Sequence, residues 1–178
     1  NSTPFTVPVV ANFTLIGSNP GLVGASGGYG MVLRRGTGGH YINGVIAHWP
    51  TGGIGYRDAQ TKARETAGLF SLQGLYVAET ATLFQAGQQV YEAPGVIEHA
   101  PATTAASLFT ALPSNPSTAS EFDWSLAAGV APRTGGVTSF SGDLQTRAGS
   151  FVTPTTFRGA ADPSGAKWWQ GWTEYSDN

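Results

Sequence analysis

The sequence contains no cysteine among its 178 residues. This absence excludes disulfide bonds, cysteine-ligated zinc and thiol chemistry. Charge is also scarce, because 9 Lys and Arg residues against 11 Asp and Glu residues leave a formal net charge of −2. No basic stripe is present to hold a phosphate backbone, so we expect no nucleic-acid partner.

Long apolar runs are missing as well. No stretch reaches the roughly 18 residues that a membrane span requires. The first residues, Asn1-Ser-Thr-Pro4, do not have the charged and apolar regions of a signal peptide. Low charge combined with abundant Ser and Thr is typical of secreted bacterial surface proteins. We therefore expect no membrane span and an extracellular or cell-surface location.

Helical periodicity is nearly absent, whereas glycine is abundant, with 25 residues. Short β-branched and aromatic runs are interrupted by glycine at close intervals, which is typical of strands. A chain of this length that is 40% hydrophobic can bury a core without a disulfide or a metal. The sequence predicts a single all-β domain.

Three similar segments recur along the first half of the chain. Each begins with an amide residue and continues into apolar or β-branched positions, and they cover residues 12–17, 43–48 and 73–78. Their starts are 31 and 30 residues apart, and a further short strand is predicted after each of them. A period of 20 to 50 residues is typical of stacked repeats. We therefore predict a solenoid of about three coils with two strands in each coil.

The amide residues that open the three segments are candidates for a ladder. In a parallel solenoid, equivalent positions of successive coils lie about 4.8 Å apart. Asn12, Asn43 and Gln73 are therefore predicted to stack at one corner, with a structural role. Ordinary turn chemistry of single amides is the alternative interpretation.

Two segments favour short helices. Residues 58–68 are good helix formers that end at glycine, with Asp58 or Thr61 as the candidate N-cap. Residues 102–112 lie between two prolines and are predicted to close one end of the solenoid.

The repeat does not continue beyond residue 112. Residues 113–178 are irregular and rich in tryptophan, so we expect an aromatic C-terminal cap that covers the last rung of the solenoid. The predicted organisation is an extended N-terminal arm (1–11), β-helix coils (12–112) and a C-terminal cap (113–178) within one domain.

Several runs resemble one known family. Residues 31–39 with the Leu-Arg-Arg-Gly-Thr run, residues 123–136, and Phe-Arg-Gly-Ala at 157–160 followed by Gly-Trp-Thr at 171–173 carry the resemblance. They are similar to the C-terminal region of secreted bacterial right-handed parallel β-helix proteins, over roughly residues 12–173. The resemblance implies a right-handed parallel β-helix of about three coils. It supports the fold rather than a function, because the family has no agreed enzymatic role.

Candidate catalytic residues are few. Arg34 or Arg57 with Asp58 would form a small charged patch, but an Arg–Asp pair that fixes a turn accounts for the same residues. The three histidines lack the spacing of metal ligands. The glycine-rich run around Ser26 lacks the strand-to-helix context of a nucleophile elbow. We expect no enzymatic activity, with a polysaccharide lyase or hydrolase activity as the alternative, and no cofactor or metal site.

The predicted first coil has an uncovered edge, and an uncovered strand edge promotes pairing with another chain. The candidate contact residues are apolar and lie near the two ends of the sequence: Phe5, Val7, Val9, Val10, Trp168, Trp169 and Trp172. A head-to-tail contact that does not close generates a fibre, and an extended arm can add a strand to a neighbour. The alternative is that the arm folds back over its own first coil. We therefore predict a non-enzymatic structural protein that assembles with copies of itself into a fibre or surface layer.

Glycan binding is the second functional hypothesis, as an adhesin module of a larger secreted protein. Tyr41, Trp49, Tyr56 and Tyr76 lie in or beside the repeat strands. Rings that point outward from a β-helix face can stack on sugar rings. Packing in the core or at a corner is the alternative for each of them.

Overall fold

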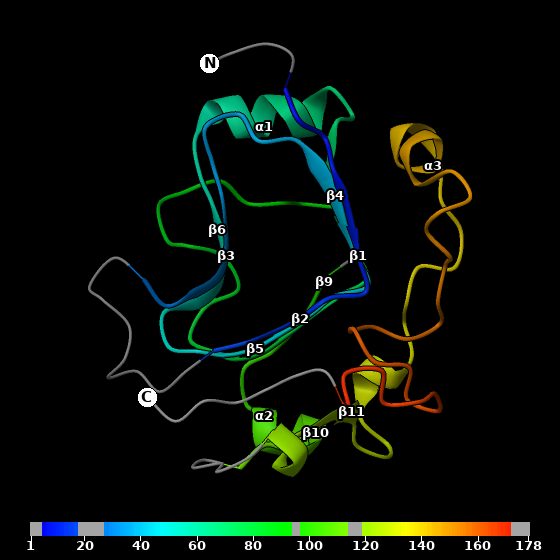
Figure 1. The fold of residues 1–178 in the computed structure, drawn as a ribbon. Coiled ribbons are helices and arrows are strands. Elements are labelled where there is room, and N and C mark those ends of the chain that lie inside the picture. The colour runs from blue at the N-terminus through cyan, green and yellow to red at the C-terminus, as the bar shows by residue number, and fades with distance from the viewer. Residues whose placement is uncertain (1–4, 18–26, 94–96, 114–118, 172–178) are drawn as a thin grey trace.

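Parallel strands dominate the structure, with few helices (Figure 1). The computed structural model describes residues 5–17, 27–93, 97–113 and 119–171. The chain passes from one parallel sheet to the next and then returns to the first sheet one level further along the stack. We call each such level a rung and the whole arrangement the strand stack.

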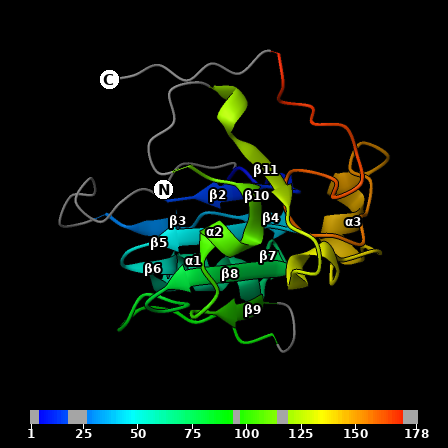
Figure 2. The ribbon, with the colours of Figure 1, turned by 90° about the horizontal axis from the view of Figure 1, so that it is seen from below.

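Within the described residues, the strand stack contains three parallel sheets. Sheet A has the order β1–β4–β7 and comprises β1 (Val9–Ala11), β4 (Gly39–Ile42) and β7 (Phe70–Gln73). Sheet B has the order β2–β5–β8–β9 and comprises β2 (Thr14–Ile16), β5 (Val45–Trp49), β8 (Leu75–Thr80) and β9 (Ile97–Ala100). Sheet C pairs β3 (Tyr29–Leu33) with β6 (Gly52–Tyr56). Figure 2 shows the strands of sheet B lying one beyond another, from β2 at one end to β9 at the other.

The strand registers define the rungs. Val9 pairs with His40 and Thr14 pairs with Val45, so equivalent residues of rungs 1 and 2 are 31 positions apart in sheets A and B. Rung 1 is β1, β2 and β3, and rung 2 is β4, β5 and β6. Rung 3 is β7, β8 and the segment around Phe84, which bridges to Ile54 of β6. β9 adds a further strand to sheet B beyond rung 3.

Sheet A corrects two expectations from the sequence. Each complete rung contains three strands rather than two, and β1 takes up Val9–Ala11, which the sequence assigned to an extended arm. The strands of sheet A are only three or four residues long, and β4 and β7 are covered on both faces. Such strands lack the alternation of apolar and polar residues that marks a half-exposed strand.

The first helix forms where the sequence predicts it. α1 (Ala59–Thr66) connects β6 to β7, and the Asp58 carboxylate caps it by accepting from the Thr61 N–H at 2.9 Å. The second helix is shorter than predicted, because α2 (Ala105–Leu108) ends where the backbone becomes extended at Phe109. The following β10 (Phe109–Ala111) pairs antiparallel with β11 (Asp123–Leu126), so strand pairing replaces the helix.

Residues 119–171, which we call the C-terminal segment, are mostly irregular. Besides β11, the segment has three short helical elements: η2 (Ala119–Glu121), η3 (Ala131–Arg133) and α3 (Gly142–Ala148). Figure 1 shows α3 beside the outer face of sheet A, and α2, β10 and β11 outside sheet B.

Three apolar clusters hold these parts together. The first fills the interior of the strand stack and consists of Leu33, Ile46, Ile54, Tyr56, Phe70, Leu72, Leu75 and Val77. The second joins the outer face of sheet B to α2, β10 and β11, and the third joins Ile42 of sheet A to Leu144 and Ala148 of α3. The C-terminal segment therefore covers the sides of the strand stack. This corrects the expectation of a cap on the last rung, where Tyr91 packs against Phe70 and Ile97 of β9 pairs with Leu75.

Among the described residues, no helix combines the length and the apolar character that crossing a lipid bilayer requires.

Candidate functional site

The predicted amide ladder exists in altered form at the corner between sheets A and B. Asn12 and Asn43 occupy equivalent positions and share the left-handed backbone conformation, with φ of 51° and 54°. Gln73 is not the next member, because it pairs with Ile42. The residue of rung 3 that is level with Asn43 is Gly74, which also has a left-handed backbone, with φ of 62°. The repeat is therefore 31 residues, whereas the sequence suggested 30 for this pair of rungs.

A glycine stands at the third ladder position for a steric reason. A Cβ atom at Gly74 would lie 2.5 Å from the Asn43 side-chain oxygen, which is far too close. The left-handed backbone also favours glycine or asparagine at this corner. The Asn43 side chain thus lies directly over the backbone of the next rung.

The ladder amides bind the C-terminal segment. Asn43 is fully buried, and its side-chain oxygen accepts from the Val137 N–H at 2.7 Å. Its Nδ2 group donates to the Thr155 hydroxyl at 3.1 Å, and Nδ2 of Asn12 donates to the same hydroxyl at 2.8 Å. The corner is therefore a structural attachment between two rungs and the C-terminal segment.

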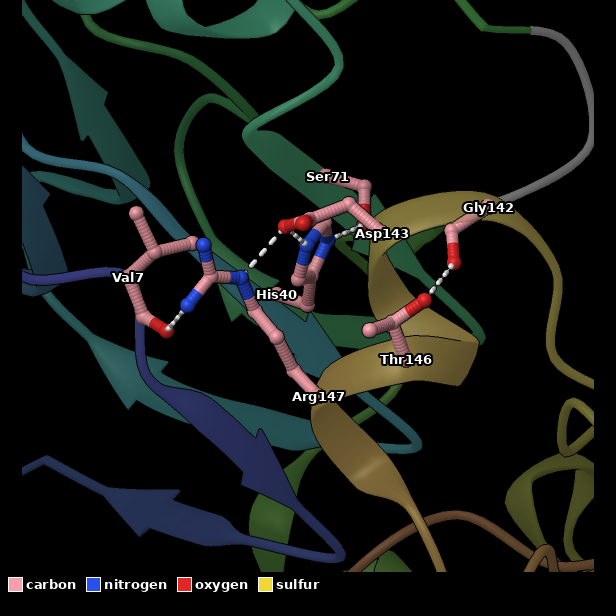
Figure 3. Close-up of polar contacts among 7 residues, drawn as sticks. All are labelled: Val7, His40, Ser71, Gly142, Asp143, Thr146 and Arg147. Carbon is pink, nitrogen blue, oxygen red and sulfur yellow. Dashed lines mark hydrogen bonds and ion pairs between the residues drawn. The ribbon is translucent and has the colours of Figure 1, made fainter.

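A second polar cluster, which was not predicted from the sequence, joins α3 to sheet A (Figure 3). His40 of β4 is buried, with its Nδ1 2.8 Å from the Ser71 hydroxyl and its Nε2 3.0 Å from the Asp143 carboxylate. Arg147, one helical turn after Asp143, pairs with the same carboxylate and donates to the Val7 carbonyl. Hydrogen bonds from His40 and Arg147 hold the pKa of Asp143 below its usual value.

Serine, histidine and a carboxylate in contact are the components of acyl-transfer sites. Here Ser71 and His40 are only 7% and 2% exposed, so the hydrogen-bonded pair is almost closed off from solvent. These residues do not line the pocket of about 450 Å³ that the structure forms beside β2. These hydrogen bonds attach α3 to β4 and β7.

Two of the three charged residues singled out from the sequence, Asp58 and Arg57, have structural partners. Asp58 caps α1 and also accepts from the Arg35 N–H. Burial opposes ionisation of Asp58, but hydrogen bonds from Arg35 and Thr61 outweigh it and keep the pKa of this carboxyl below its usual value. Arg57 donates to the Gln85 side chain at 2.6 Å, whereas Arg34 is exposed. In the described part of the chain, no group of three or more acidic or histidine residues could hold a metal ion.

The predicted row of sugar-stacking rings is not present. Tyr56 and Tyr76 are buried, and burial raises the pKa of Tyr56, whose hydroxyl donates to Glu65 at 2.7 Å. Tyr41 and Trp49 are half-buried and pack against the interior cluster. Tyr41, Trp49 and Tyr56 thus belong to the interior packing, whereas Tyr76 is buried on the outer face of sheet B in the second cluster. The packing alternative is correct for all four rings.

The predicted assembly residues lie in different environments. Trp169 is buried and Trp168 is half-exposed on the side of the molecule, while Trp172 lies outside the described residues. Phe5 is half-buried, with the Arg64 guanidinium carbon 3.6 Å from its ring centre. Val7 is half-buried, and Val9 packs against the third cluster with α3.

The open end of the strand stack lies at rung 1. Val10 pairs with Tyr41, which in turn pairs with Leu72, so these three residues occupy one interior column. Val10 is 36% exposed, whereas Leu72 is fully buried. In two further columns, Leu15 and Met31 of rung 1 are only partly buried, although their rung 2 equivalents are buried. The interior of the strand stack is thus less covered at rung 1 than at rung 3.

An aromatic pocket of about 450 Å³ lies where the C-terminal segment meets β2. Its walls include the rings of Phe122, Trp124, Trp168 and Trp169, and its aliphatic wall includes Ile16 and Leu112. We call this the aromatic pocket. The paired aromatic residues at 122 and 124 and at 168 and 169 were visible in the sequence, but their convergence on β2 was not.

Comparison with family models, curated proteins and solved structures gives no match to this chain. The resemblance to secreted bacterial parallel β-helix proteins therefore stays a prediction.

Proposed function

We propose that the strand stack is a right-handed parallel β-helix of about three coils that acts as a non-enzymatic structural module. The order of the sheets along the chain and the constant register support this fold. Crossovers between parallel strands of one sheet are right-handed in about 98% of cases, which supports the handedness. An extracellular setting is part of the proposal and depends on the composition and the family resemblance.

The module is proposed to associate with a second copy through rung 1. The observation that carries this proposal is the interior column Val10–Tyr41–Leu72, which is covered at rung 3 and open at rung 1. An apolar interior that reaches the surface favours contact with another apolar surface. The low charge of the chain supports this contact, because little repulsion opposes it.

The two ends of the strand stack favour a closed pair over a fibre. Contact between rung 1 of both copies is isologous and closes around a twofold axis, with edge strands free to pair across it. At the other end, β9 carries Glu98, which forms an ion pair with Arg158 at 2.7 Å. Charged side chains on an edge strand hinder pairing with another chain. Fibre growth needs a second adhesive end, so we expect dimers before fibres.

No observation favours glycan binding through the four predicted rings, because Tyr56 and Tyr76 are buried and the other two are half-buried.

Light scattering coupled to size-exclusion chromatography tests the association on residues 1–178. We expect a mass of twice 18.4 kDa at high concentration and dissociation on dilution. Val10→Lys places a charge at the open end and is expected to give a monomer. Val10→Thr, which is nearly the same size, is expected to weaken the dimer while leaving the fold intact by circular dichroism.

The matched control is Phe151→Lys, which adds the same charge at a side chain that is 96% exposed on the C-terminal segment. This variant is expected to dimerise like the wild-type chain. A wild-type chain that stays monomeric, or a dimer that survives both Val10 substitutions, would overturn the proposal. Regular fibres that disappear with Val10→Lys would support rung 1 as one of two adhesive ends.

A further inference from the structure

The aromatic pocket has the properties of a small-molecule site, and it does not depend on the proposed association. Its volume of about 450 Å³ lies within the range of roughly 300 to 1,000 Å³ that is typical of ligand sites. Its walls come mainly from β2 of rung 1 and from the C-terminal segment, which are more than 100 residues apart in sequence, with Leu112 as a further wall residue. We infer that the aromatic pocket binds a small, uncharged organic molecule that carries an aromatic ring.

The arrangement of the rings supports an aromatic ligand. The ring centres of Trp124 and Trp169 are 5.5 Å apart, and those of Trp168 and Trp169 are 5.9 Å apart at an angle of 88°. Trp169 is buried, whereas Trp168 is 52% exposed. Aromatic rings attract one another in tilted and offset arrangements at such separations. The pocket lining therefore presents indole rings in more than one orientation.

The polar groups of the pocket support an uncharged ligand. The Thr14 hydroxyl accepts from the Ala160 N–H at 3.0 Å, and Nε1 of Trp168 donates to the Ala160 carbonyl at 2.9 Å. These groups are thus engaged within the pocket wall. No charged residue is among the described residues that line the pocket. Burial of an ion without a partner is costly, and a sugar needs several hydrogen-bond partners, so the lining disfavours both.

Calorimetric titration and tryptophan fluorescence can test this inference with four probes. The probes are 2-naphthol, naphthalene-2-sulfonate with the same ring and a charge, decanol as an apolar chain, and cellotriose as a sugar. We expect 2-naphthol to bind one site per chain and to change the tryptophan emission. The other three are expected to bind more weakly or not at all. Tighter binding of decanol, the sulfonate or cellotriose than of 2-naphthol would overturn the proposed ligand class.

A pocket-filling variant locates the site. Ala160→Trp places a large ring in the aromatic pocket and is expected to abolish 2-naphthol binding. Ala106→Trp adds the same ring at an exposed position of α2 and is expected to leave binding unchanged. Trp168→Phe, which keeps a ring at this half-exposed position, is expected to bind more tightly than Trp168→Ala.

Each outcome decides the inference. Binding that persists in Ala160→Trp would place the ligand elsewhere and overturn the proposal. Absence of 2-naphthol binding to a folded wild-type chain would do the same. The oligomeric state is measured separately, so failure here leaves the association through rung 1 untouched.

Discussion

The strand stack and the C-terminal segment are held in different ways. In the strand stack, residues that pair between successive rungs of sheets A and B are 31 positions apart in sequence. The buried interior cluster extends over all three rungs. The C-terminal segment has no such repeat. It is attached through the second and third apolar clusters and by single polar contacts, such as Asn43 with Val137 and His40 with Asp143.

This difference predicts different responses to damage. In the strand stack each rung packs on the next, so the removal of one interior side chain is expected to destabilise neighbouring rungs together. The C-terminal segment depends on individual contacts that have no substitute. Local release of the segment, with the strand stack intact, should therefore be separable from global unfolding.

The largest expected effect comes from the interior of the strand stack. Leu72 is fully buried at the centre of rung 3. Leu72→Ala is expected to lower the free energy of unfolding by about 2–5 kcal/mol, because it removes buried apolar surface and leaves a cavity. Urea denaturation followed by circular dichroism measures this change.

The matched variant is Leu144→Ala, which removes the same atoms where α3 packs against sheet A. We expect hydrogen exchange to speed up in α3 while the strands stay protected. Equal loss of protection in α3 and in the strands of both variants would show that the two regions unfold as one unit.

The second prediction concerns the corner where the two regions meet. Gly74→Ala forces a side chain into a left-handed position, at a cost of about 1–2 kcal/mol. It also pushes against Asn43, whose contact with the Val137 N–H would be lost, and a buried unsatisfied donor costs about 1–3 kcal/mol. We expect a total destabilisation of about 3 kcal/mol in urea denaturation.

Gly68→Ala is the control for the backbone alone. Its φ is 72°, but a Cβ atom there would meet nothing within 4 Å. It should therefore cost only the conformational part, about 1–2 kcal/mol. If both variants are equally destabilised, Asn43 does not contribute to the attachment.

The sequence predicts the strand stack better than the attachment, for a physical reason. The strands β2, β5 and β8 follow predicted segments because each repeats an apolar pattern with a fixed spacing. Gln73 was assigned to the ladder because its chemistry matches Asn43, but the register depends on a steric contact that favours Gly74. Side-chain chemistry alone does not reveal which residue lies beneath its neighbour.

The cluster around His40 was beyond prediction for a different reason. His40 and Asp143 are 103 residues apart in sequence, and no repeat connects them. Their contact depends on how α3 lies against sheet A, which follows from the small apolar cluster with Ile42. The aromatic pocket is similar, since its rings converge only after the C-terminal segment has packed against β2.

The smallest expected effect is the acid sensitivity of the α3 attachment. Hydrogen bonds from His40 and Arg147 lower the pKa of Asp143 in the folded state. The folded state therefore favours the carboxylate, and this contribution to stability is present above the usual Asp pKa of about 3.9. It is lost as the pH falls from that value through the lower pKa of the folded state.

Asp143→Asn should therefore destabilise the protein near pH 7 by about 1 kcal/mol, a value typical of a partly exposed ion pair. The difference between the wild-type chain and the variant should shrink as the pH falls below about 4, because both then carry a neutral group at residue 143. Hydrogen exchange in α3 measures this locally, with Glu92→Gln as a control at an exposed carboxylate outside the cluster. A difference that stays constant with pH would mean that the Asp143 charge does not fasten α3, and would leave its apolar contacts with Ile42 as the attachment.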